Sequence, residues 1–171
     1  GIFKLNCFLK NGGIPMSIKR KSAVLILYAV SGICMAVPYV FQEMFFVAWI
    51  GFIPVIYFEI NKIYTKKNHP YRSAWLRGFN FFYPYSVVLF SWFVSMYPLD
   101  FAGLDNAASV AVIIAGVFGL SFLQSVISSI IFVIFRIGKE RLKLSSPVLE
   151  VFVFAFLWVL HEWIGTLGWW A

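Results

Sequence analysis

Two neighbouring ionisable residues, His161 and Glu162, stand inside an apolar run near the C-terminal end of the sequence. A His-Glu pair opens the metalloprotease pattern, in which a second histidine one helical turn later completes a zinc site. Gly165 occupies that place here. No other histidines and cysteines have metal-ligand spacing, so the sequence predicts no metal and no cofactor.

A serine and a histidine on two apolar segments would suit an intramembrane serine protease, with His161 activating Ser121. The second glycine that lets backbones close around such a serine is missing, because Phe122 holds its place. Small polar residues at helical spacing are more simply explained as helix contacts, often bonded to their own backbone. We therefore expect packing at Ser121 rather than catalysis.

Glu162 is the residue that packing explains least. If its helix begins at Ser146, helical rise puts Glu162 about 24 Å along it, toward the outer leaflet. An unpaired carboxylate in hydrocarbon is costly, so such groups are generally paired, protonated or functional. Two interpretations stay open: Glu162 reaches the outer interface beside Trp163, or it belongs to a binding site.

Glu59 and Glu150 lie closer to basic connections than Glu162 does. Lys62 follows Glu59, and Lys143 precedes Glu150. We expect both glutamates to form ion pairs at the cytoplasmic interface.

The composition identifies the solvent around these groups. Hydrophobic residues make up 61% of the 171 residues and charged residues 12%, and the mean hydropathy is +0.85. A soluble core of this size could not bury so much apolar surface. The net charge of +7 would suit a nucleic-acid binder, but the cations stand in blocks between apolar runs rather than on a polar face. We expect a membrane protein with no nucleic-acid partner.

Crossing about 30 Å of hydrocarbon takes roughly 20 helical residues, and five segments approach that length. They predict an all-α, polytopic membrane bundle of about five transmembrane helices. The expected helices cover about residues 22–37, 40–60, 74–97, 107–135 and 146–163.

Charge orients the segments, because lysine and arginine near helix ends stay on the cytoplasmic side. All 14 precede the first segment or lie in or beside the connections after the second and fourth. The other two turns hold Glu43, Asp100 and Asp105 instead. The pattern predicts a cytoplasmic N-terminus and an external C-terminus.

Residues 1–21 are expected to be a basic cytoplasmic tail, followed by a membrane domain over 22–171. Met16 precedes Lys19, Arg20 and Lys21, like the start of an uncleaved first helix. We therefore expect translation to begin at Met16 and residues 1–15 to be either a gene-model extension or a disordered tail.

Five short motifs occur in an order that resembles the N-terminal membrane region of bacterial apolipoprotein N-acyltransferase, over residues 22–171. Ile164 or Gly165 departs from the family pattern, standing where an arginine is common. The residues that carry the resemblance are Pro38 within 36–39; Trp49, Gly51 and Pro54 within 49–55; Gly78 within 74–82; Trp92; and Glu162 within 157–163, followed by Gly168 and Trp169.

The resemblance implies a multi-pass protein of the bacterial inner membrane whose nitrilase-like catalytic domain, with its Glu-Lys-Cys triad, lies outside this sequence. In the family that domain takes an acyl chain from a phospholipid as a thioester and passes it to the amino group of a lipoprotein's diacylglyceryl-cysteine. This chain would supply the membrane platform and be inactive alone, with no catalytic residue of its own. Trp92, Glu162 and Trp169 would line a groove for phospholipid and lipoprotein lipid chains.

Two other functions remain open at this point. Aromatic-rich helices could form a small substrate-binding membrane subunit of a transporter, which predicts a partner ATPase or a sixth helix. A membrane protein with neither ligand nor enzymatic activity is the other alternative.

Overall fold

The computed structural model describes residues 18–61, 70–142 and 146–166. These residues form α-helices joined by short 3-10 helices and turns, with no strand among them. The predicted all-α class is confirmed.

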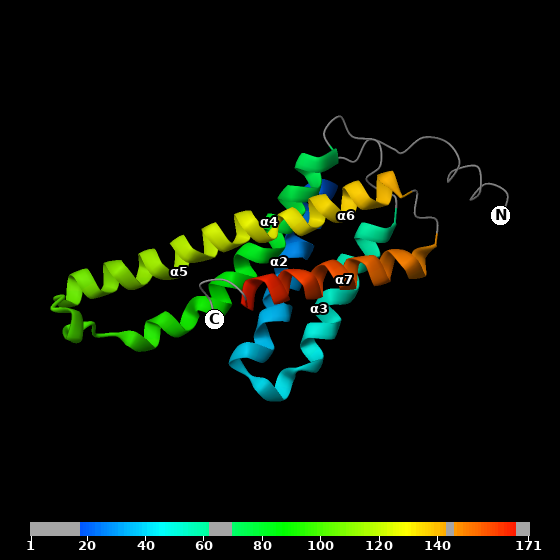
Figure 1. Cartoon of the computed structure of the whole chain (residues 1–171). Coiled ribbons are helices and arrows are strands. Elements are labelled where there is room, and N and C mark those ends of the chain that lie inside the picture. The colour runs from blue at the N-terminus through cyan, green and yellow to red at the C-terminus, as the bar shows by residue number, and fades with distance from the viewer. Residues whose placement is uncertain (1–17, 62–69, 143–145, 167–171) are drawn as a thin grey trace.

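Two helical hairpins and one further helix make up the bundle (Figure 1). The first hairpin joins α2 (Ile18–Val40) through η1 (Gln42–Met44) to α3 (Phe46–Ile60). The second hairpin is longer. Its first arm is α4 (Pro70–Leu89), which continues into η3 (Phe90–Met96). After η4 (Asp100–Ala102), its second arm consists of α5 (Asn106–Ser128) and α6 (Ile130–Arg141). The last helix, α7 (Pro147–Thr166), packs against α6 and α3.

Within the described parts of the chain, three helical stretches are long and apolar enough to cross a membrane: Ser22–Val40, Asn106–Arg141 and Pro147–Gly165. The apolar helix Phe46–Ile60 is shorter. In α4 the first turns carry Arg72, Arg77 and Asn80, which lowers the apolar character of a helix otherwise long enough to span.

The ends of several helices differ from the sequence-based bounds. The first continues through Pro38 to Val40, and the second begins only at Phe46 because η1 precedes it. The fourth predicted helix is two helices that meet at Ser129. The hydroxyls of Ser121, Ser125 and Ser129 each donate to the carbonyl four residues earlier, a bond that often bends a helix.

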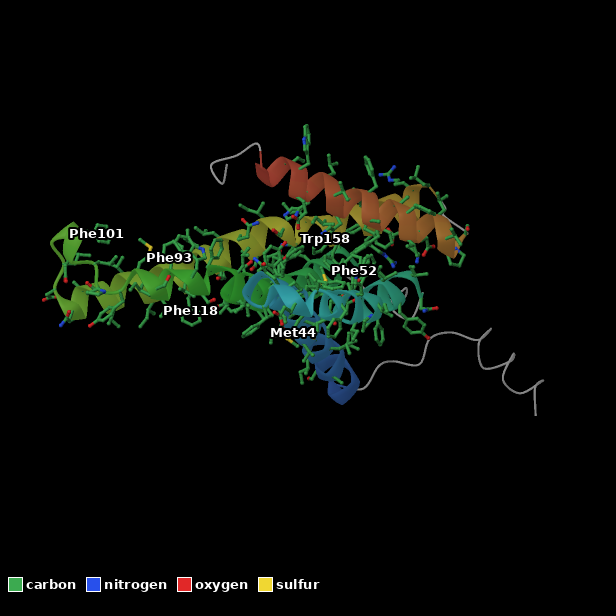
Figure 2. The ribbon with its side chains drawn as sticks, turned by 90° about the horizontal axis from the view of Figure 1, so that it is seen from below. Met44, Phe52, Phe93, Phe101, Phe118 and Trp158 are labelled. Atoms are coloured by element: carbon green, nitrogen blue, oxygen red, sulfur yellow. The ribbon has the colours of Figure 1, made fainter. Side chains whose placement is uncertain are left out.

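An aromatic cluster fills the centre, where α4, α6 and α7 meet. The Phe82 ring stacks on Trp158 of α7 with centroids 5.5 Å apart, and Phe132 of α6 lies edge-on to Phe82 at 6.1 Å. Phe52 of α3 closes the cluster against Trp158, with ring centroids 5.3 Å apart. Figure 2 labels both side chains near the centre of the bundle. Burial of these rings joins the hairpins to α7.

Among the described glycines, Gly32 has the least room for a side chain, where α2 crosses α4. A Cβ built at Gly32 would overlap the carbonyl oxygen of Phe81. Helices in lipid associate through such small residues because lipid competes for apolar contact. The α2–α4 interface, the most extensive in the bundle, therefore depends on this glycine.

We predict that Gly32→Ala lowers thermal stability in detergent micelles by about 1–3 kcal/mol, the usual cost of overpacking. Gly119→Ala is the matched control, since nothing lies within 4 Å of its Cβ position and alanine favours a helix by roughly 0.5–1 kcal/mol over glycine. Equal thermal stabilities of the Gly32→Ala and Gly119→Ala variants would contradict a close contact between α2 and α4 at Gly32.

Candidate functional site

A buried ion pair joins α3 to α4 at the end of the bundle that carries the basic residues. Arg77 donates from Nε to Glu59 Oε1 at 2.6 Å and from Nη2 to Oε2 at 2.9 Å. The Tyr28 hydroxyl of α2 donates to the same Oε1 at 2.7 Å. Glu59 is 6% exposed and Arg77 4%. The fork of arginine matches both carboxylate oxygens, which is the strong geometry for such pairs.

A second buried pair, Lys139 of α6 with Glu150 of α7, lies beside the first. Lys139 Nζ donates to Glu150 Oε2 at 2.6 Å and to the backbone carbonyls of Glu59 and Ile60 at 3.2 and 2.6 Å. Those carbonyls end α3, and a cation there satisfies groups that the helix leaves unpaired. The four charges cancel, so this ionic network ties five helices together without net charge.

The partners of Glu59 and Glu150 differ from those the sequence favoured. Both glutamates were expected at the interface with Lys62 or Lys143, which lie outside the described residues. The structure pairs them with Arg77 and Lys139 inside the bundle, because both cations lie within helices that face them.

At the surface of the same basic end, a smaller network links the start of α4 to the end of α6. The Tyr71 hydroxyl donates to Glu140 Oε2 at 2.9 Å, and Arg136 Nε donates to Oε1 at 2.8 Å. The hydrogen bond from Tyr71 to Glu140 raises the pKa of the tyrosine, so the hydroxyl stays a neutral donor.

His161 pairs with a different serine from the one considered above. Its Nε2 lies 2.9 Å from Ser128 Oγ, which also accepts from Gln124 Nε2 at 3.2 Å. Ser121 instead donates to the carbonyl of Val117. Ser128 is fully buried, so the pair acts as a polar contact between α5 and α7.

Two buried polar atoms have no hydrogen-bond partner among the described residues: Ser86 Oγ and His161 Nδ1. Ser86 stands one turn beyond Phe82 in α4, and His161 stands one turn beyond Trp158 in α7. The Phe82 ring contacts both Trp158 and His161, at 5.5 and 5.6 Å. Unpaired groups of this kind are rare in native interiors.

Glu162, the next residue, is exposed. Tyr85 of α4 is buried, and its ring meets that of Tyr39, at the end of α2, edge-on with centroids 6.0 Å apart. Tyrosines of α2 and α4 therefore converge beyond the aromatic cluster.

Trp92 does not belong to this convergence. It lies in η3, 55% exposed, with its ring 4.2 Å from that of Phe93. Figure 2 places Phe93, Phe101 and Phe118 along the far part of the α4–α5 hairpin, away from Trp158. Trp169 lies outside the described residues, so the grouping of all three residues into one groove stays a prediction.

The remaining motif residues lie within helices or at contacts between helices. Pro38 and Pro54 stand inside α2 and α3, and Trp49 is 69% exposed on the outer surface of α3. A Cβ at Gly51 would come within 2.6 Å of the Cys34 side chain, and one at Gly78 within 3.0 Å of the Ser129 backbone. Both glycines thus permit close helix contacts.

No group of three metal-ligating side chains occurs within 18–61, 70–142 and 146–166. The buried charges, the apolar spans and the polar convergence define a multi-pass helical membrane protein. Across residues 31–171 the sequence matches the family described as the apolipoprotein N-acyltransferase N-terminal domain. The chain belongs to this family. No curated protein and no solved structure shows detectable similarity to it.

We predict that Arg77→Met or Glu59→Leu alone destabilises the bundle by about 3–5 kcal/mol, because each leaves a buried charge unpaired. The double variant should recover most of the loss. Thermal unfolding in micelles measures all three.

Glu140→Gln removes an exposed carboxylate from an i,i+4 pair and serves as the control, with an expected cost of about 0.5 kcal/mol. Single variants no worse than this control would contradict a structural role for the buried pair.

Proposed function

We propose that this chain is the membrane portion of an enzyme that N-acylates bacterial lipoproteins at the inner membrane. The observation that carries the proposal is the family match over residues 31–171. Family membership favours this function over a transporter subunit or a protein without enzymatic activity. The apolar spans provide a platform for two lipid-bearing substrates.

The reaction proposed for the complete enzyme proceeds in two transfers. A cysteine thiolate of the nitrilase-like domain attacks a phospholipid ester, forming a thioester and releasing a lysophospholipid. The amino group of a diacylglyceryl-cysteine then attacks the thioester, forming an amide and regenerating the thiol. A general base and an oxyanion-stabilising cation assist such steps.

The membrane portion contributes substrate positions rather than reacting groups. Cys34 packs in α2 beside Gly51, so we assign it to helix packing. Trp92, Glu162 and Trp169 are proposed to line the external side of the bundle, where lipid substrates enter from the outer leaflet.

We predict that the chain alone transfers no acyl group from phospholipid to a diacylglyceryl-cysteine peptide. The same chain joined to a nitrilase-like domain of the family should transfer one, because the triad is then present. Mass spectrometry of the peptide detects the added acyl chain.

The matched control is the joined protein with the triad cysteine replaced by alanine, which should be inactive. Transfer by the chain alone would contradict the assignment as a platform. A coding region with no nitrilase-like frame beyond or near this sequence would remove the proposed function itself.

A further inference from the structure

The arginines at the surface of the bundle differ from the cations in its interior. Within the described residues, the buried cations Arg77 and Lys139 each have a glutamate partner inside the protein. Arg72 and Arg141 are exposed, and neither forms a salt bridge with another described residue. A guanidinium group without a carboxylate from its own chain is available to an anion from outside it.

One contact brings these two arginines to the same part of the surface. The Tyr71 hydroxyl donates to Glu140 Oε2 at 2.9 Å and so joins the start of α4 to the end of α6. Arg72 directly follows Tyr71, and Arg141 directly follows Glu140. Arg136 lies at the same place, with its Nη2 2.7 Å from Glu140 Oε1. Arg72, Arg136 and Arg141 therefore form an arginine patch in which one carboxylate faces three cations.

The arginine patch lies where apolar helices end. The apolar stretch Asn106–Arg141 finishes at the patch, and α4 begins beside it at Pro70. The segment 78–135, between the two sides of the patch, contains no lysine or arginine. A headgroup region about 5–8 Å deep borders each side of the hydrocarbon layer. The patch is therefore at the level of the phosphate groups of one leaflet.

The surroundings of the arginine patch suit a lipid better than a soluble anion. Ile137 and Leu142 are exposed beside Arg136 and Arg141, so apolar surface adjoins the cations. A molecule whose anionic headgroup is joined to acyl chains fits both parts of this surface, whereas a soluble polyanion meets only the charged part. The planar fork of arginine matches phosphate oxygens, and basic clusters at a membrane boundary attract anionic lipids.

We propose that the arginine patch at the start of α4 and the end of α6 binds the phosphate of an anionic phospholipid headgroup. Glu140 opposes this binding, because its carboxylate neutralises Arg136 and repels the phosphate. The inference goes beyond the proposed function and does not depend on it, since it uses none of the residues proposed to meet the lipid substrates.

Native mass spectrometry of the full chain measures the lipids that it retains. The chain in detergent micelles is incubated with equal amounts of palmitoyl-oleoyl-phosphatidylglycerol and palmitoyl-oleoyl-phosphatidylcholine. The two lipids have the same acyl chains, and only the first has a net negative charge. We expect the chain to retain phosphatidylglycerol about fivefold more than phosphatidylcholine, the effect of roughly one arginine near an anionic headgroup.

The double variant Arg72→Gln with Arg141→Gln should reduce that preference to about 1.5-fold or less, and it keeps the fold because both side chains are exposed. The matched control, Lys4→Gln with Lys10→Gln, removes the same charge from the sequence before α2 and should keep the preference. Glu140→Gln should raise the preference about twofold, a gain that misfolding cannot produce. Equal retention of the two lipids, an equal loss in both double variants, or no gain with Glu140→Gln would overturn the proposal.

Discussion

Lipid supplies no water to a buried charge, so Glu59 and Arg77 must neutralise each other inside the protein. Their pair, with Tyr28 of α2, fixes how α2, α3 and α4 meet. Lys139 adds α6 and α7 by binding Glu150 and the last carbonyls of α3. Apolar contact alone is weakly specific among helices in lipid. This network therefore sets the register of the bundle, and the aromatic cluster packs within that register.

The same constraint separates structural from functional charge. At the basic end of the bundle each buried carboxylate pairs with a cation of the chain. Glu162 of α7 is exposed instead and forms no salt bridge within the described residues. The buried charges therefore stabilise the fold, whereas Glu162 has no such role.

Much of this architecture follows from the sequence, because hydropathy and cation placement depend on local residues. The helical class is confirmed, and the family resemblance is confirmed over residues 31–171. The ends of the helices were harder to predict from the sequence than the helical class. Pro38 does not end α2, and the break at Ser129 depends on hydrogen bonds from serine hydroxyls to the backbone. The ion-pair partners of the buried glutamates were the hardest feature to predict, because Glu59 and Arg77 meet only through tertiary geometry. Arg77 inside a predicted helix was the available signal that a buried partner exists.

The central claim is that the ionic network and all basic residues face the cytosol while the acidic turns lie outside. Cysteines at Ala102 and Ser146, placed singly in a variant with Cys7 and Cys34 replaced by serine, test it directly. An impermeant thiol reagent added to spheroplasts should label the cysteine at Ala102 and should reach the one at Ser146 only after the membrane is permeabilised. Labelling in the opposite order would contradict the orientation.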